Sequence, residues 1–466
     1  MSTMLEASAT EAGKLNRIRE SLDTWFVKDA ESGRFRLDRE VFTDPDLFEL
    51  EMKHIFERNW IFLGHESQLA KPNDFMTAYI GRQPVLLSRT RSGELKCFIN
   101  ACSHRGARIC RERAGNKKNF TCPFHGWTYS TAGELLDVTD QAQGGYLPTF
   151  DRADYALEEI GRLESYRGFI FGSLSPDVVP LEDYLAGAKT MIDLMVDQSP
   201  AGEWEVLRGA TRYTYKGNWK LQAENGLDGY HIGNVHASYF MTVQRRFDGK
   251  STNDTKAFDF GTWDQLEGGS FSFHNGHSVL WNDYANFQDR PNYELLDWLK
   301  QKYGADLAKW MNGRIRNLLL FPNVFLMDQT STQIRILRPI SVDETEVITY
   351  CIAPVGESAK ARALRIRQYE DFFNASGMAT PDDLTEFNNC QIGFGHGPGR
   401  YNDMSRGASR FVRGANDHGK AINLNVVMSG EQVADEGLYI AIHEDWVGRM
   451  KAAVAEEMNE LAEAAE

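Results

Sequence analysis

The sequence predicts an α+β protein in which a small antiparallel β domain is followed by a larger α+β domain. The chain has 466 residues, a length that suits two or three domains. Between Trp60 and about Leu163, short apolar runs are broken by turn residues, a pattern typical of antiparallel strands. The rest of the chain combines strand-like runs with helical periodicity at 180–197, 292–312, 358–376 and 444–462.

Individual elements follow in chain order. Thr43-Asp44-Pro45 pairs a cap residue with a proline and predicts the start of a helix that ends near Asn59-Trp60. Turns are expected at Arg91-Ser92-Gly93-Glu94 and Ser130-Thr131-Ala132-Gly133. Strands are expected at Phe169-Ile170-Phe171 and Leu337-Arg338-Pro339. The helix over 444–462 has one apolar face, which we expect to pack on the domain rather than to bind a partner.

Composition and charge exclude several classes of function. The net charge is -15 and the pI is about 5.3, so nucleic acid and anionic membrane surfaces would repel the chain. We find neither an apolar stretch long enough to cross a bilayer nor a secretory signal. Six cysteines are too sparse for a disulfide scaffold, and the sequence therefore predicts a cytoplasmic protein that keeps its thiols or uses them to bind metal.

Two short segments each supply one cysteine and one histidine. They are Cys102-Ser103-His104-Arg105-Gly106 and Cys122-Pro123-Phe124-His125-Gly126-Trp127. Zinc is the alternative, but zinc fingers generally take two cysteines from one element and two histidines from another. A [2Fe-2S] cluster with two cysteines on one iron and two histidines on the other fits the interleaved order. Cys97 and Cys110 have no matching histidine, and we expect them to be small buried residues.

A second group of chelating residues lies in the segment from Glu224 to His236. Two histidines, His231 and His236, follow Asp228. On an ideal helix the two histidines would point about 140° apart, so the helix must bend or end between them, and Gly233-Asn234 would allow that. Two imidazoles and one carboxylate form the facial triad of Fe(II) oxygenases, but spacing alone does not choose the carboxylate among 66 acidic residues.

With both motifs in view, the chain resembles the large subunits of Rieske aromatic-ring-hydroxylating dioxygenases over nearly its full length. It is most similar to the benzoate, toluate and anthranilate group. The supporting stretches outside the metal motifs are Ile80-Gly81-Arg82-Gln83-Pro84, Asn100 to Ala107, Met195-Val196-Asp197-Gln198-Ser199-Pro200, and the region from Asp371-Phe372-Phe373-Asn374 to Thr380-Pro381-Asp382-Asp383.

The resemblance assigns roles residue by residue. His231 and His236 match the two iron histidines of the family, and Asp383 matches the third ligand. Asp382 is the competing carboxylate, with a helix-capping role before Leu384 as its structural alternative. Asp228 matches an aspartate that bridges an iron histidine and a cluster histidine across a subunit boundary, which implies an electron relay between His231 and His125.

The resemblance also implies an architecture and a reaction. It divides the chain into an N-terminal helical segment at 1–57 that packs on the catalytic domain, a Rieske [2Fe-2S] domain at 58–165, and a catalytic mononuclear iron domain at 166–466, in which helices surround an antiparallel sheet. The reaction would insert both atoms of O2 into an aromatic carboxylate of the benzoate or anthranilate type. The product would be a cis-dihydrodiol. If the aromatic acid carries a 2-amino group, the product would instead be catechol, after loss of ammonia and carbon dioxide. The alternative is a Rieske monooxygenase or demethylase acting on another aromatic acid.

Cofactors and partners follow from the same resemblance. The chain would hold one Rieske [2Fe-2S] cluster and one mononuclear Fe(II). It contains no GxGxxG that opens a helix after a strand, so NADH would be used by a separate iron-sulfur flavoprotein reductase. The family commonly forms a homotrimer or an α3β3 assembly with a small β subunit.

No residue is assigned to the substrate from the sequence. Recognition of a carboxylate favours an arginine or another donor in an apolar pocket. Arg335 and Arg338 lie in an expected strand, but we expect surface or structural pairing for both. The glycine-rich stretch Gly393 to Arg400 lacks the residues of a phosphate-binding loop, and we interpret it as a mobile surface loop.

Overall fold

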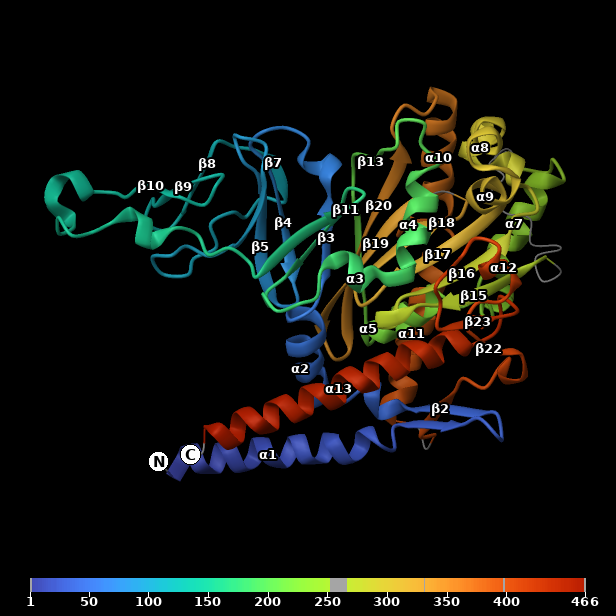
Figure 1. The fold of residues 1–466 in the computed structure, drawn as a ribbon, viewed down its shortest axis with the longest axis horizontal. Helices are drawn as coiled ribbons and strands as arrows, with labels where there is room; N and C mark the ends of the chain where they lie inside the picture. The colour runs from blue at the N-terminus through green and yellow to red at the C-terminus, as the bar shows by residue number, and fades with distance from the viewer. Residues whose placement is uncertain (1, 252–265, 331, 397–398, 465–466) are drawn as a thin grey trace. The chain divides into compact units, whose positions relative to one another are not determined.

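The computed structural model in Figure 1 describes residues 2–251, 266–330, 332–396 and 399–464. Its contacts divide the chain into two compact units, one formed by 55–181 and the other by 1–54 together with 182–466. The N-terminal segment therefore belongs to the same unit as the C-terminal part of the chain. The domain limits at 57/58 and 165/166 stay predictions.

The smaller unit is built from three antiparallel sheets. One has the order β11 (Arg162–Tyr166), β12 (Phe169–Ser173), β3 (Ile61–His65); the second β6 (Leu95–Ile99), β5 (Gln83–Arg89), β4 (Asp74–Ile80), β7 (Ala114–Asn116); and the third β10 (Leu135–Asp137), β9 (Thr128–Ser130), β8 (Asn119–Thr121). The turns expected after β5 and β9 are present, with Gly93 and Gly133 at φ of 92° and 86°. Cys97 and Cys110 are buried, as expected.

The larger unit contains a 10-stranded sheet whose neighbouring strands are all antiparallel. Its order is β13 (Trp204–Val206), β20 (Glu344–Pro354), β19 (Thr332–Ser341), β18 (Val324–Asp328), β17 (Arg314–Leu320), β16 (Ser278–Asp283), β15 (Gly268–Ser272), β23 (Met428–Gly430), β22 (Val412–Arg413), and β14 (Thr211–Tyr215) also pairs with β20. A small separate sheet holds β1 (Phe26–Asp29), β2 (Arg34–Asp38) and β21 (Tyr401–Asp403). The predicted α+β class is confirmed.

Helices complete the fold of the larger unit beside its 10-stranded sheet (Figure 1). They are α1 (Ser2–Leu22), α2 (Pro45–Glu51), α3 (Leu181–Leu185), α4 (Lys189–Val196), α5 (Trp219–Asn225), α6 (Ile232–Val235), α7 (Ala237–Phe247), α8 (Leu296–Tyr303), α9 (Ala305–Ala308), α10 (Ala359–Phe372), α11 (Thr380–His396), α12 (Asp417–Lys420) and α13 (Gly437–Glu463). Helix α2 starts as expected, because Asp44 accepts from the amides of Asp46 and Leu47 and Pro45 follows it.

The long C-terminal helix packs on its own unit. Trp446, Met450 and Val454 of α13 are buried, which confirms the expected packing of this helix. Figure 1 shows α1 lying alongside α13, and Lys451 pairs with Asp23 at 2.5 Å just beyond the end of α1. No helix in the described ranges is long and apolar enough to cross a membrane.

Helix α5, which leads to the second metal motif, is anchored by a buried carboxylate. Glu51 accepts hydrogen bonds from the indoles of Trp219 at 3.0 Å and Trp446 at 2.7 Å, and from Lys220 Nζ at 2.7 Å. Glu51 is completely buried, so these donors supply the polar contacts that water would otherwise provide. The start of the motif is thereby held in place by the N-terminal segment and by α13.

One expected loop is wrong. Gly393 to His396 continue α11 rather than forming a surface loop. The helix starts at Thr380, so several turns are already formed before it reaches these glycines. Extending a formed helix is easier than starting one, and the helix therefore continues through them. Residues 397–398 of the expected loop lie outside the described part of the chain.

Candidate metal centres

The two cysteine-histidine loops have the same backbone design. In the first loop, the amide of Cys102 donates to the carbonyl of Ala107 and the amide of Gly106 donates to the carbonyl of Cys102, both at 2.8 Å. In the second loop, the amide of Cys122 donates to the carbonyl of Trp127 at 2.7 Å, and the amide of Gly126 donates to the carbonyl of Cys122 at 3.0 Å. Both glycines have left-handed φ values, 72° and 77°, which favour glycine.

This design brings the four predicted ligands together around one place. The thiols of Cys102 and Cys122 are buried, whereas the imidazoles of His104 and His125 are partly exposed. The two imidazole rings lie 4.6 Å apart between centroids. His104 also stacks on Trp127 at 4.8 Å and 10°. Two buried thiols and two imidazoles nearer the surface are the donor set that a Rieske cluster takes.

The electrostatics of these loops agree with that donor set. Burial raises the pKa of the Cys102 thiol, and the neighbouring Cys122 raises it further, although the Tyr129 hydroxyl at 3.2 Å opposes the shift. Metal must therefore displace a proton to bind there. Burial and the nearby charges of His125 and Arg105 lower the pKa of His104, a shift that favours the neutral ring over the charged one. Its Nδ1 atom is buried without a hydrogen-bond partner among the described residues.

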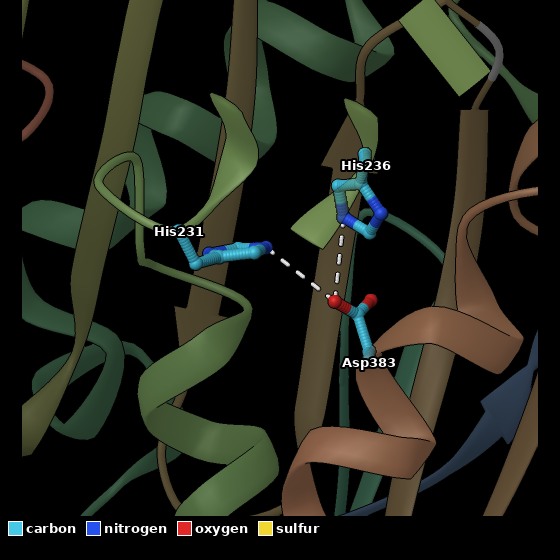
Figure 2. A group of neighbouring side chains, drawn as sticks. All are labelled: His231, His236 and Asp383. Atoms are coloured by element: carbon cyan, nitrogen blue, oxygen red, sulfur yellow. Dashed lines mark ion pairs between the residues drawn. The ribbon is translucent and has the colours of Figure 1, made fainter. Parts of the chain in front are cut away.

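The second motif brings three side chains to a common point from two separate parts of the chain. His231 precedes α6, His236 lies between α6 and α7, and Asp383 is in the first turn of α11. Figure 2 shows the three side chains pointing toward one another. Asp383 Oδ1 is 3.4 Å from His231 Nε2 and 3.3 Å from His236 Nε2, and one ligand atom from each residue lies within 4.8 Å of the others. Two imidazoles and one carboxylate in this arrangement fit a facial triad.

The charges within this group are strongly coupled. Burial disfavours a charged ring at His231, but the neighbouring carboxylates of Asp228 and Asp383, each 3.4 Å away, outweigh it and raise the pKa of His231 to about 10. Burial alone would also raise the pKa of Asp383, yet the two imidazoles hold that pKa well below its usual range. A carboxylate that stays ionised in a buried site is suited to a divalent cation, which would replace the protons on the imidazoles.

Two further carboxylates support the histidine rings from behind. Asp228 Oδ2 lies 3.4 Å from His231 Nδ1, while its Oδ1 accepts from the amides of Tyr230 at 2.6 Å and His231 at 3.2 Å. Asp382 Oδ2 lies 3.6 Å from Nδ1 of His236. Each carboxylate therefore faces the ring nitrogen that points away from Asp383. Asp382 is not a helix cap before Leu384, because α11 already begins at Thr380.

The helix ends between the two histidines, as expected. Gly233 and Asn234, which would have allowed a bend, lie inside α6. The helix stops at Val235, and His236 has φ -98° and ψ 22° before α7 begins. Because His236 itself leaves the helical conformation, its ring turns to face His231, at 5.2 Å between centroids.

A pocket opens beside the triad and lies against the large sheet. Its wall is mainly apolar: Leu280, Trp281, Ile315, Met327, Phe372, Phe373, Ala379 and Val433 line it. Polar side chains contribute as well: Asn282, Arg316, Asn317, Gln329, Thr330 and Arg335. A mainly apolar cavity with a few polar groups next to a metal triad is the usual form of a site for a small organic molecule.

Sequence reasoning missed two residues of this site. Asn225, the last residue of α5, donates from Nδ2 to Asp383 Oδ1 at 3.3 Å and lies 3.4 Å from His231 Nε2. An asparagine within six residues of a ligand histidine was the available signal. Arg338 pairs with Glu346 at 3.0 Å, as expected of a structural arginine. The same expectation is wrong for Arg335, which is buried and lines the pocket.

Two family models match the chain. One describes the catalytic domain of the ring-hydroxylating alpha subunit and matches residues 202–460, and the other describes the Rieske [2Fe-2S] domain and matches 59–155. The chain belongs to the ring-hydroxylating dioxygenase α subunits. It is thus an oxidoreductase whose family carries a Rieske cluster and a mononuclear iron.

Known relatives cover almost the whole of this α subunit. It is 50% identical to the toluate 1,2-dioxygenase subunit alpha of Pseudomonas putida. That match covers 95% of this chain and 97% of the relative. It is 47% identical to the anthranilate 1,2-dioxygenase large subunit of Acinetobacter baylyi, and that match covers 89% of each chain. Among solved structures, a naphthalene 1,2-dioxygenase with indole in its active site matches with a TM-score of 0.76 at 25% identity, covering 90% of this chain and 94% of that one.

Proposed function

We propose that this α subunit catalyses the dihydroxylation of an aromatic carboxylate of the benzoate or 2-aminobenzoate type. The observation that carries the proposal is the mainly apolar pocket beside His231, His236 and Asp383. Relatives that are 47% to 50% identical over nearly the whole chain are named for toluate, 2-halobenzoate and anthranilate, which are all aromatic carboxylates.

We propose Cys102, His104, Cys122 and His125 as the ligands of the cluster, and His231, His236 and Asp383 as the ligands of the mononuclear iron. The matching backbone bonds of the two loops and the donor set support the first group. The convergence of two Nε2 atoms on Asp383 Oδ1 supports the second. When bound, the cluster supplies single electrons and the iron supplies the place where dioxygen is activated.

The supporting residues of the chain orient the iron ligands. Asp228 Oδ2 lies 3.4 Å from His231 Nδ1 as an ion-pair partner, and this charge favours the ring orientation in which Nε2 is directed toward Asp383. Asp382 stands in the same relation to His236. Asn225 donates to the carboxylate oxygen that both imidazoles face, which limits the rotation of the Asp383 side chain. A further role of Asp228 in relaying electrons from the cluster of a neighbouring subunit is part of this proposal.

The pocket performs the remaining tasks. Trp281, Phe372 and Phe373 are buried side chains that offer flat apolar surface to an aromatic ring. Holding the ring between such surfaces excludes water and fixes which carbon atoms face the iron. Two carbon-oxygen bonds then form on adjacent ring carbons, while the O–O bond of a single O2 molecule and one π bond of the ring break. NADH supplies two electrons through the reductase, two protons are taken up, and a cis-dihydrodiol results.

The proposal includes partner proteins. The relatives are named as large or alpha subunits, which supports a system of several components. We propose a small β subunit, a homotrimer or an α3β3 assembly, and an iron-sulfur flavoprotein reductase that oxidises NADH in the cytoplasm.

A single-turnover experiment tests the proposed function. The purified holoenzyme is reduced chemically, exposed to ¹⁸O₂ with equimolar benzoate and 2-aminobenzoate, and its products are identified by mass spectrometry. We expect a dihydroxylated benzoate, or catechol with released ammonia, carrying both labelled atoms. A product with one labelled atom would identify a monooxygenase instead. Reoxidation of the cluster without either product would reject the substrate class.

A further inference from the structure

Arg335 is a buried cation without an ionic partner among the described residues. Its side chain lines the pocket beside the triad, and only 3% of the residue is exposed. It lies on β19 in register with Phe325 of β18 on one side and Thr349 of β20 on the other. The strand is hydrogen-bonded on both sides at this point, so the backbone that carries the guanidinium is held firmly in place.

The polar atoms of this guanidinium are poorly satisfied. Nε is buried without a hydrogen-bond partner among the described residues. The contact that the structure gives the guanidinium is with a ring: Cζ lies 5.6 Å from the centroid of Phe373, another residue of the pocket. An arginine keeps its charge when buried, and an uncompensated buried charge is costly for the fold. Its presence in a pocket therefore indicates that an anion balances it there.

The anion would lie close to the metal triad. The charges of Arg335 and Asp383 both act on the Tyr213 hydroxyl, the first lowering and the second raising a pKa that burial has already raised. Both groups also line the same pocket. A small aromatic acid can therefore contact the guanidinium with its carboxylate while its ring lies against the apolar wall near the triad.

The other arginines near this part of the sheet are already paired. Arg316 lines the pocket but forms an ion pair with Asp328, which Arg290 also contacts. Arg338 lies three residues beyond Arg335 on the same strand and therefore faces the opposite side of the sheet, where it pairs with Glu346. Arg335 thus differs from these neighbouring arginines because no carboxylate of the described residues pairs with it.

We propose that Arg335 binds the carboxylate of the substrate and thereby selects aromatic acids over neutral aromatic compounds. This assignment rests on the proposed function and deepens it. A planar guanidinium can donate two parallel hydrogen bonds to a carboxylate, which fixes the orientation of the ring as well as its affinity. Arg335 is accordingly a specificity residue, and the iron ligands are unaffected by its replacement.

Equilibrium binding separates this role from a structural one. The holoenzyme and its R335Q and R335K variants are titrated with benzoate, with 2-aminobenzoate and with benzamide, a neutral compound of the same shape as benzoate, using isothermal titration calorimetry. We expect R335Q to weaken binding of the acid by about 100-fold or more while changing benzamide binding by less than about 3-fold. R335K keeps the charge but loses the paired geometry, so we expect a loss of about 10-fold.

The matched control is R338Q, which makes the same chemical change on the opposite face of β19. We expect it to leave binding of all three compounds unchanged. Melting temperature and the visible spectrum of the cluster are recorded for every variant. R335Q should melt no lower than the unmodified protein, because it removes an unpaired buried charge. A lower melting temperature together with equal weakening of benzoate and benzamide would show a structural role and overturn the proposal.

The failure of this proposal is distinguishable from failure of the proposed function. If the unmodified protein neither binds nor converts an aromatic acid, the proposed function fails. If it binds benzoate or 2-aminobenzoate and R335Q binds that acid with unchanged affinity, the function stands and the assignment of Arg335 is wrong.

Discussion

The two candidate metal centres of this chain are built in opposite ways. All four cluster residues lie between residues 102 and 125, on two loops whose backbone bonds are the same. The iron triad instead joins His231 and His236 to Asp383, which comes from a distant helix. The first centre depends on local turn geometry, whereas the second depends on packing of the whole larger unit. Damage to either centre should therefore leave the other in place.

The largest expected effect comes from removing a cluster ligand. Cys102→Ser should abolish NADH-driven turnover, a loss of at least about 10³-fold, because the proposed route of electrons to the iron runs through the cluster. The visible spectrum of the cluster should disappear, while the larger unit keeps its fold and its iron. Circular dichroism, sulfide analysis and iron analysis check these outcomes. Unfolding of the whole chain would break the comparison, because the centres would then not be independent.

Replacing Asp228, which faces His231, should lower turnover less than replacing a proposed metal ligand does. Asp228→Asn keeps the shape but removes the charge that faces His231 Nδ1, so we expect turnover to fall by about 10- to 100-fold with iron still bound. Stopped-flow reoxidation of the reduced cluster measures the step directly. Asp382→Asn is the matched control on His236. Normal turnover and normal reoxidation in Asp228→Asn would remove Asp228 from the electron relay.

Two buried histidines outside the candidate metal centres make the stability of each unit depend on pH. Burial lowers the pKa of His65 in the smaller unit to about 4 and that of His277 in the larger unit to about 3. An unfolded histidine binds a proton below about pH 6.5, whereas these remain neutral. Stability is therefore full above pH 6.5 and falls as the pH decreases toward each folded value. We expect each histidine to lower the free energy of unfolding of its unit by about 2 kcal/mol between pH 6.5 and pH 5.

Urea unfolding at a series of pH values, followed by circular dichroism, measures this loss. His277→Asn should be less stable than the unmodified protein at neutral pH, because Nδ1 of His277 accepts from the amide of Phe321 at 2.9 Å. It should also lose less stability on acidification. An unchanged pH slope in this variant would contradict the assignment.

The smallest expected effects concern the glycines of the two cluster loops. Gly106 and Gly126 both have left-handed φ, but a methyl group at Gly106 meets nothing within 4 Å, whereas at Gly126 it would lie 2.8 Å from Thr139 Oγ1. Gly106→Ala should therefore cost about 1 kcal/mol and Gly126→Ala about 2 kcal/mol or more. Thermal bleaching of the cluster spectrum measures both. Equal losses would mean that the loops are less alike in rigidity than their hydrogen bonds indicate.

The same contrast explains what could be predicted from the sequence. The proposed ligands of the cluster follow from residue types at short spacing, because a tight loop places neighbours in the chain near one another in space. The two iron histidines were predicted for the same reason. Asp383 could be chosen over Asp382 only through family resemblance, because helix α11 reaches the site through tertiary packing that spacing does not encode.

Arg335 shows the limit at the level of a single strand. Arg335 and Arg338 lie on opposite faces of β19, and the alternation of side chains predicts that much. Which face borders the pocket depends on the helices that cover the sheet, and these are far away in the sequence. The break between the two histidines was predicted, but its exact position at His236 was not: glycine permits a bend, whereas what the flanking helices pack against decides where the helix ends.

Iron and sulfide analysis of Asp383→Ala tests the central claim, that two independent centres are held by these two sets of residues. We predict that this variant keeps the sulfide content and visible spectrum of the unmodified protein, loses only the iron that is not in the cluster, and has no turnover. Asp382→Ala, purified in parallel, should keep its iron. Full iron content in Asp383→Ala, or loss of sulfide together with iron, would contradict the account.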